Sequence, residues 1–199
     1  MKSDVFKNYD IIADWFSTNR SKDLMEKPYL DRLIEHIPTN SRILDLGCGT
    51  GEPIYGYFKE KGYSLCGVDA SSAMLAIARR NFPDGDFIHQ DMRDLDIDEK
   101  FDAIIAWHSF FHLAQQEQRD MFPLFKKHLK IKGILLFTSG ADEGEAWGMN
   151  SGQNLYHASL SKQEYNSLLN EQGFSVIQHV VSDPNCGGAT IWLCQLKED

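Results

Sequence analysis

Short apolar runs alternate with amphipathic segments along most of this chain. The runs end at polar or glycine-rich turns, which is the pattern of strands that are buried on both faces of a sheet. They predict strands at residues 43–46, 64–69, 86–90, 101–107 and 133–138. Two later runs, at residues 174–181 and 189–196, predict a closing pair of strands.

Apolar residues at helical spacing fill the gaps between these strands. The predicted helices cover residues 27–37, 52–62 and 116–130 and two segments that begin after Ser71 and Ser161. Ser71 is a good N-cap, and Ser161 forms a capping box with Glu164. Pro123 should kink its helix or mark the real start of that helix. Strands that alternate with helices predict an α/β fold, with helices on both faces of a mostly parallel sheet and an antiparallel last strand.

The length and composition are those of one globular domain. The 199 residues are 42% hydrophobic and 25% charged, so we expect a single domain over residues 1–199 with a substantial core. No apolar run approaches the roughly 20 residues that span a membrane. The first residues lack an apolar signal core, so a cytoplasmic protein without membrane association is expected.

The cysteines and the charge narrow the choice of partners. Four cysteines, at positions 48, 66, 186 and 194, show no C-x-x-C pairs, which gives poor support to disulfides or a metal cluster. We expect all four to be reduced and at least half-buried. The formal net charge is -9, and no segment is dense in lysine or arginine. Because phosphate recognition needs a basic face, this charge disfavours nucleic acid and favours a small-molecule substrate.

The most informative segment follows the first predicted strand. It reads Ile43-Leu44-Asp45-Leu46-Gly47-Cys48-Gly49-Thr50-Gly51-Glu52, an apolar run that ends in an acid and three alternate glycines. Glycine lets the backbone adopt left-handed angles and approach a ligand closely, because no Cβ stands in the way. The spacing differs from the Gly-x-Gly-x-x-Gly of dinucleotide-binding folds. It closely resembles motif I of the class I S-adenosylmethionine-dependent methyltransferases, whose fold is a seven-stranded Rossmann-like sheet, and the resemblance extends from Tyr9 to Leu196.

This resemblance implies an S-adenosyl-L-methionine site at the carboxyl ends of the strands. Asp69, at the end of the second strand, would accept hydrogen bonds from the ribose hydroxyls, and Asp91 with Met92 would meet the adenine. Each acid also has a plainer explanation, as a helix cap or a solvated residue after a strand, and Met74 can equally fill the core. The residues expected to bind the cofactor are Tyr9, Arg20, Asp45, Gly47, Cys48, Gly49, Asp69, Ala70, Met74, Asp91, Met92 and Trp107.

The segment after the fourth strand carries the candidate catalytic residues. In the family it faces the methyl group and the acceptor, so Trp107 could wall the sulfonium and His108 or His112 could take a proton. Either histidine could instead cap or pack. A metal site is not expected, because His108 and His112 lack both a zincin-type glutamate and a third ligand.

The first 26 residues are expected to form an N-terminal lid. The pattern in residues 9–20 resembles lids of this superfamily, including those of the tRNA wobble-uridine methyltransferases, and would let Tyr9 and Arg20 contact the cofactor. The alternative is an amphipathic docking helix with Ile11, Ile12, Trp15 and Phe16 in the core. Both descriptions can hold at once.

Two more segments should reach the same rim. Residues 139–160 are expected to form a long glycine-rich loop that includes Trp147, Tyr156 and His157, and residues 183–188 form another. Long loops of this kind usually serve binding or closure. We expect a partly aromatic pocket for a small, largely neutral acceptor.

The sequence therefore predicts an S-adenosylmethionine-dependent methyltransferase that acts on a small molecule. A tRNA methyltransferase and a non-catalytic regulator that binds the same cofactor remain as alternatives. An aminopropyl transferase is disfavoured by the lack of an acidic pair after the fourth strand, and a nicotinamide-dependent oxidoreductase by the glycine spacing. The acceptor, the methylated atom and the oligomeric state are left open.

Overall fold

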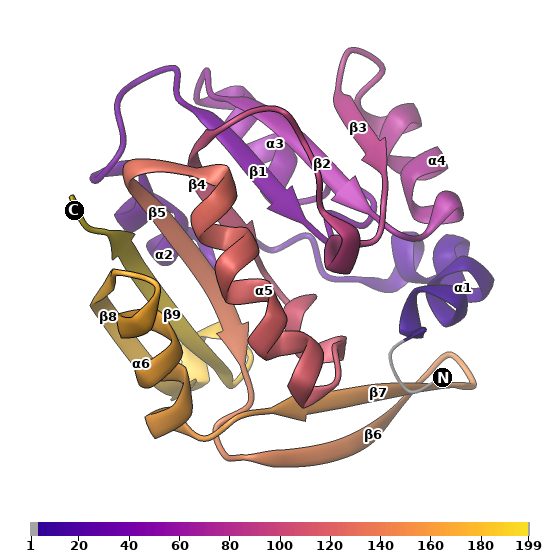
Figure 1. Ribbon diagram of the computed structural model, residues 1–199. Helices are drawn as coiled ribbons and strands as arrows, with labels where there is room; N and C mark the ends of the chain where they lie inside the picture. Colours follow the sequence, from indigo (N-terminus) through magenta and orange to yellow (C-terminus); the bar gives the residue numbers. More distant parts are fainter. Residues whose placement is uncertain (1–3, 199) are drawn as a thin grey trace.

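The computed structural model describes residues 4–198 and contains one seven-stranded sheet (Figure 1). Its strands are β1 (Arg42–Leu46), β2 (Ser64–Asp69), β3 (Asp86–His89), β4 (Phe101–Ala106), β5 (Leu129–Ser139), β8 (Phe174–Asp183) and β9 (Ala189–Leu196). Their order across the sheet is β3-β2-β1-β4-β5-β9-β8. The pairs among β1 to β5 are parallel, whereas β9 runs antiparallel to both β5 and β8. The predicted fold class is therefore confirmed.

Helices cover both faces of this sheet. They are α1 (Val5–Asn19), α2 (Lys27–Ile34), α3 (Ile54–Glu60), α4 (Ser72–Asn81), α5 (Gln115–His128) and α6 (Lys162–Glu171), with 3-10 turns η1 (Met92–Asp94), η2 (Phe110–His112) and η3 (Pro184–Cys186). Neighbouring residues of β1 show how the core divides: Ile43 packs with Leu33 of α2 and Phe58 of α3. Leu44 belongs to the buried cluster on the opposite face, which includes Phe125 of α5 and Leu169 of α6. No described helix is both long and apolar enough to cross a membrane.

The segment expected to be a long loop is instead a β-hairpin. Strands β6 (Gly144–Asn150) and β7 (Gln153–Ser159) pair antiparallel with each other in a separate two-stranded sheet. The turn between them holds Ser151 at φ 45° and Gly152 at φ 76°. These two left-handed residues match the twist of a tight hairpin turn, so the chain reverses without a long loop.

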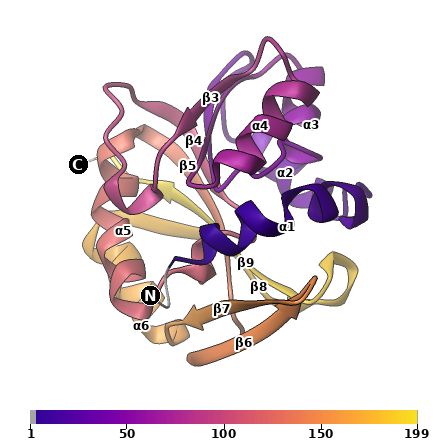
Figure 2. The ribbon, with the colours of Figure 1, turned by 90° about the vertical axis from the view of Figure 1, so that its right-hand side faces the viewer.

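Helix α1 lies beside α4 and next to the hairpin (Figure 2). Asp10 of α1 accepts hydrogen bonds from the Ser71 hydroxyl at 2.7 Å and the Ala73 amide at 3.0 Å. The Asn8 side chain donates to the Asn154 carbonyl of β7 at 2.7 Å. Ile12 is buried as expected, but Ile11 and Trp15 are 68% and 44% exposed. The docking-helix alternative was therefore wrong for these two side chains, which point away from the core. Residues 1–3 of the expected lid lie outside the described residues.

Local signals in the sequence set several element ends. The Ser71 hydroxyl accepts from the Met74 amide and caps α4, and Ser161 accepts from the Glu164 amide and caps α6. Pro123 lies inside α5, so it does not mark the start of that helix. All four cysteines are buried and free, in agreement with the sequence.

Candidate functional site

A cavity of about 370 Å³ lies at the carboxyl ends of β1, β2, β3 and β4 and is also lined by residues of α1 and of the β6–β7 hairpin. Every residue expected at the site lines it: Tyr9, Arg20, Asp45, Gly47, Cys48, Gly49, Asp69, Ala70, Met74, Asp91, Met92, Trp107, His108 and His112. The volume lies in the range of small-molecule sites. The structure thus brings together residues that are up to about a hundred positions apart in the chain, because parallel strands end at the same edge.

The glycine turn after β1 is built so that its backbone faces this cavity. Gly47, Gly49 and Gly51 have φ values of 74°, 55° and 77°, a region that other residues adopt only with strain. A Cβ on Gly47 would lie 2.3 Å from the Ser109 Cβ, whereas one on Gly49 would meet nothing within 4 Å. Gly47 is therefore required for packing, and Gly49 leaves open space on the cavity side.

Asp69 orders this turn from the neighbouring strand. One carboxylate oxygen accepts from the Gly49 amide and the other from the Ser71 amide, both at 2.8 Å. Burial raises the pKa of Asp69, and these two amides oppose that rise. Each oxygen has a further lone pair, so Asp69 can still accept hydrogen bonds from a ligand in the cavity.

Groups of opposite charge meet beside the same turn. Asp45 is only 3% exposed, and burial together with the charge of Asp69 raises its pKa to about 7. The Arg20 guanidinium opposes this rise, and its Nε is buried without a hydrogen-bond partner in the described structure. Its Nη2 lies 3.9 Å from the Glu26 carboxylate. A buried donor without a partner is costly, which indicates that this end of the cavity is shaped for a polar ligand.

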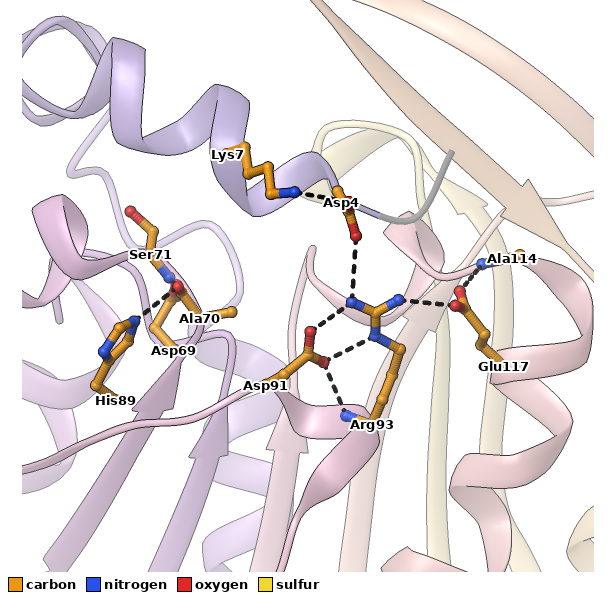
Figure 3. Close-up of polar contacts among 10 residues, drawn as sticks. All are labelled: Asp4, Lys7, Asp69, Ala70, Ser71, His89, Asp91, Arg93, Ala114 and Glu117. Carbon is orange, nitrogen blue, oxygen red and sulfur yellow. Dashed lines mark hydrogen bonds and ion pairs between the residues drawn. The ribbon is translucent and has the colours of Figure 1, made fainter. Parts of the chain in front are cut away.

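Asp91, the acid expected at the adenine, is held by Arg93 (Figure 3). Its Oδ1 accepts from the Arg93 backbone amide and from Nε, both at 3.0 Å, and its Oδ2 accepts from Nη2 at 2.5 Å. Arg93 was not among the residues predicted from the sequence. Its position two residues after the acid, at the start of a short turn, was the signal that could have found it.

The two candidate catalytic histidines differ in what they bind. Both ring nitrogens of His112 have partners: Nδ1 faces the Tyr156 carbonyl at 2.8 Å, and Nε2 faces the Tyr9 hydroxyl at 3.0 Å. His108 has φ 51°, an uncommon conformation for a non-glycine residue that concentrates at functional sites. Burial, together with Arg20 and His157, lowers the pKa of His108 to about 4. It is therefore neutral near pH 7.

The hairpin contributes a wall where the sequence predicted a loop. His157 of β7, which we expected on the rim, does line the cavity and lies against Phe111 and His112, with ring centroids 5.2 and 4.7 Å apart. Tyr156, which we expected on the rim, is fully buried and faces the other way, towards Trp147. Residues that line the cavity and were not among the expected cofactor-binding, catalytic or rim residues are Val5, Phe6, Phe16, Thr50, Gly51, Glu52, Ile54, Val68, Gln90, Ser109, Phe111, Leu113, Gly148, Met149, Asn150 and Leu155.

A second cavity of about 400 Å³ shares the side chains of His108, Phe111 and His157 with the first. Gly187 and Gly188 line this second cavity and are absent from the lining of the first, so the 183–188 segment borders a neighbouring space. Its described lining includes the acids Asp142, Glu143 and Glu145 and contains no lysine or arginine. Across residues 4–198, no group of three His, Cys, Asp or Glu side chains is placed to hold a metal ion.

Known proteins resemble the chain in sequence and in fold. A methyltransferase domain profile matches residues 43–133. The putative methyltransferase YqeM of Bacillus subtilis (strain 168) is 39% identical over 108 residues, which cover 51% of this chain and 43% of that protein. A dTDP-3-amino-3,6-dideoxy-alpha-D-glucopyranose N,N-dimethyltransferase of Streptomyces fradiae is 31% identical over 130 residues, 64% of this chain and 50% of the other. The chain thus spans about half the length of these curated relatives.

The similarity in fold extends over nearly the whole chain. The S-adenosylmethionine-bound structure of an amino pentose methyltransferase from Micromonospora echinaspora superposes with a TM-score of 0.73 at 19% identity. The superposition covers 93% of this chain and 95% of that one. At this level of identity the likeness establishes the fold, and the chemistry has to be argued from the residues themselves.

Proposed function

We propose that this chain, which belongs to the class I S-adenosylmethionine-dependent methyltransferases, binds S-adenosyl-L-methionine in the first cavity and methylates a small-molecule acceptor. One observation carries the proposal: the cavity holds oppositely charged groups at one end, Arg20 and Asp45, and an ordered acid, Asp69, beside the open backbone of Gly49.

The polar side chains of the first cavity match the chemical groups of the cofactor one by one. The unpartnered Nε of Arg20 suits the methionine carboxylate, and the buried Asp45 suits the ammonium group. The remaining lone pairs of Asp69 suit the two ribose hydroxyls. Asp91 and Met92, which follow β3, suit the adenine, and Met74 lines the same cavity. A buried charge that is paired with an opposite charge costs less free energy than an unpaired one, so the carboxylate and the ammonium group of the methionine part should each bind favourably beside these side chains.

When bound, S-adenosylmethionine supplies a methyl group that its sulfonium already activates, so the protein needs mainly to orient the acceptor and exclude water. Trp107, which is 4% exposed, closes the wall beside His108 and offers an aromatic face to a cation. The hairpin and α1 cover the remaining sides.

The second cavity is our candidate for the acceptor site. It meets the first at His108, Phe111 and His157, so an acceptor there would lie against the expected methyl position. The three acids in its lining disfavour anionic acceptors and favour neutral or cationic ones. His108 is our candidate to take a proton from the acceptor, because it lines both cavities.

Calorimetry and a turnover screen test the proposal. The chain should bind S-adenosylhomocysteine in the micromolar range, about -8 kcal/mol, and should not bind NAD. A panel of neutral, cationic and anionic small molecules is then offered with S-adenosylmethionine, and S-adenosylhomocysteine formation is measured. Turnover should appear among neutral or cationic acceptors. Binding of NAD without binding of S-adenosylhomocysteine would refute the cofactor assignment, and turnover of tRNA alone would refute the acceptor class.

A further inference from the structure

We infer that Arg93 is a positioning residue: it fixes the orientation of the Asp91 carboxylate, so that the adenine end of the site accepts an amino group and rejects a carbonyl. The inference rests on the proposed function, because it concerns how the same cavity distinguishes one nucleobase from another.

The geometry between the two side chains is that of a bidentate pair. Arg93 meets Asp91 with Nε on one carboxylate oxygen and Nη2 on the other, and its backbone amide adds a third contact to Oδ1 (Figure 3). A planar guanidinium that binds both oxygens fixes the plane of the carboxylate as well as its position. A lysine would supply the charge but not this fork.

The remaining capacity of the carboxylate defines what it can recognise. Oδ1 already accepts two hydrogen bonds, whereas Oδ2 accepts one and keeps a lone pair. Asp91 lines the cavity, so this lone pair can accept from the exocyclic amino group of adenine. A carbonyl oxygen at the same place, as in hypoxanthine, would face a fixed negative charge. If the carboxylate could rotate away, that penalty would be smaller.

Two further carboxylates hold Arg93 from outside the site. Its Nη1 donates to Glu117 at 2.8 Å, and Glu117 in turn accepts from the Ala114 amide at the start of α5 at 2.8 Å. Its Nη2 lies 3.6 Å from Asp4, which directly precedes α1 and accepts from Lys7 at 2.9 Å. The Arg93 side chain is 23% exposed, so these contacts are only partly screened by water. Asp91 is thereby anchored to α5 and to the beginning of α1.

The test compares S-adenosylhomocysteine with S-inosylhomocysteine, in which a carbonyl replaces the adenine amino group. The ratio of their dissociation constants is measured for the wild-type chain and for the Arg93→Lys and Arg93→Met variants. The wild-type chain should strongly prefer the adenine ligand, and both variants should reduce this preference by about tenfold, the effect of 1.4 kcal/mol. Arg119→Met serves as a matched control, because it breaks an arginine–glutamate pair with Glu164, a residue of α6, and should leave the ratio unchanged.

The outcomes separate this inference from the proposed function. A general loosening of the fold would weaken both ligands alike and leave the ratio intact, so a ratio equal to that of the wild type in both Arg93 variants would overturn the positioning role. Failure of the wild-type chain to bind S-adenosylhomocysteine would refute the cofactor assignment itself, and the inference with it.

Discussion

The Tyr9 hydroxyl lies 3.0 Å from Nε2 of His112 and joins α1 to the turn that follows β4. Burial raises the pKa of Tyr9 to about 12, so the hydroxyl keeps its proton and donates. On the other side of the same ring, Nδ1 donates to the Tyr156 carbonyl of β7, because a carbonyl can only accept. One imidazole therefore holds both structures that cover the cavity.

Removal of the Tyr9 hydroxyl should loosen this arrangement. In Tyr9→Phe, Nε2 of His112 loses its donor while buried, which should cost about 1 kcal/mol. We expect S-adenosylhomocysteine to slow hydrogen exchange across residues 9–20 in the wild-type chain and to do so less in the variant. Tyr63→Phe is the control, because Tyr63 directly precedes the first residue of β2 and does not line the cavity. Equal protection with and without ligand in the wild-type chain would identify α1 as a fixed helix and not a lid.

The two histidines should respond differently to substitution. His108→Ala should lower kcat by about 10²–10⁴ and leave S-adenosylhomocysteine binding nearly unchanged, because the proposed role of this side chain is to take a proton from the acceptor. His112→Ala should weaken ligand binding and reduce the protection of α1 and β7, because its two hydrogen bonds hold those elements. Steady-state kinetics with an acceptor found by the screen, together with calorimetry, separates the effects. Full activity in the His108 variant would leave positioning alone as the source of catalysis.

Asp69 should be required for the cofactor more than for the fold. Asp69→Ala removes the acceptor for the Gly49 amide and the proposed ribose contacts, so the dissociation constant of S-adenosylhomocysteine should rise by an amount equivalent to roughly 1.5–3 kcal/mol. Asp96→Ala removes an exposed carboxylate that pairs with Lys127 and should have no such effect. An unchanged dissociation constant in the Asp69 variant would reject the ribose role.

Asp45 should give binding and stability opposite pH dependences. Its folded-state pKa, about 7, lies above the ordinary value of 3.8. Between about pH 4 and 7 Asp45 is therefore ionised in the unfolded chain and protonated in the folded one, so the free energy of unfolding falls as the pH rises through this range. Asp45→Asn should therefore raise Tm relative to the wild type more at pH 8 than at pH 5.

The affinity for the ligand should depend on pH in the opposite direction from the stability. If the Asp45 carboxylate holds the ammonium group, the affinity of the wild-type chain for S-adenosylhomocysteine falls as the pH drops below 7. The Asn variant should bind weakly, with little dependence on pH over the same range. Calorimetry at several pH values, beside thermal melts of both proteins, measures the two trends. A pH-dependent affinity retained in the Asn variant would assign the titration to another group.

The strands of the main sheet could be predicted because burial on both faces leaves a continuous apolar run, as in Ile134-Leu135-Leu136-Phe137. The hairpin lacks this signal. Most of β6 is exposed, so its sequence has no apolar alternation to mark it as a strand. The pair Ser151-Gly152 at the turn was the one available clue, and it needs flanking strands to be interpretable.

The residues of the site likewise divide into those that the sequence predicts and those that it does not. Residues at strand ends, such as Asp45, Asp69 and Asp91, could be placed because the topology alone brings those positions to one edge. Arg93 could not, because its role depends on side-chain contacts between separate segments, and His157 was placed at the rim but on a loop where the structure has a strand. The exposure of Ile11 and Trp15 had a similar origin: the pattern marks α1 as amphipathic, but only the packed structure shows which side chains its neighbours cover.

The β6–β7 hairpin takes no hydrogen-bonded strand partner from the seven-stranded sheet among the described residues. Its length and side chains can therefore change without shifting the register of any strand that carries the glycine turn, Asp69 or Asp91. If the second cavity takes the acceptor, residues of the hairpin that line only that cavity, such as Glu145 and Ala146, can then change acceptor selectivity without moving the strand ends that carry Asp69 and Asp91. Grafting a different hairpin between Gly140 and Leu160 is accordingly a route to new acceptors on an unaltered scaffold, for evolution as well as for engineering.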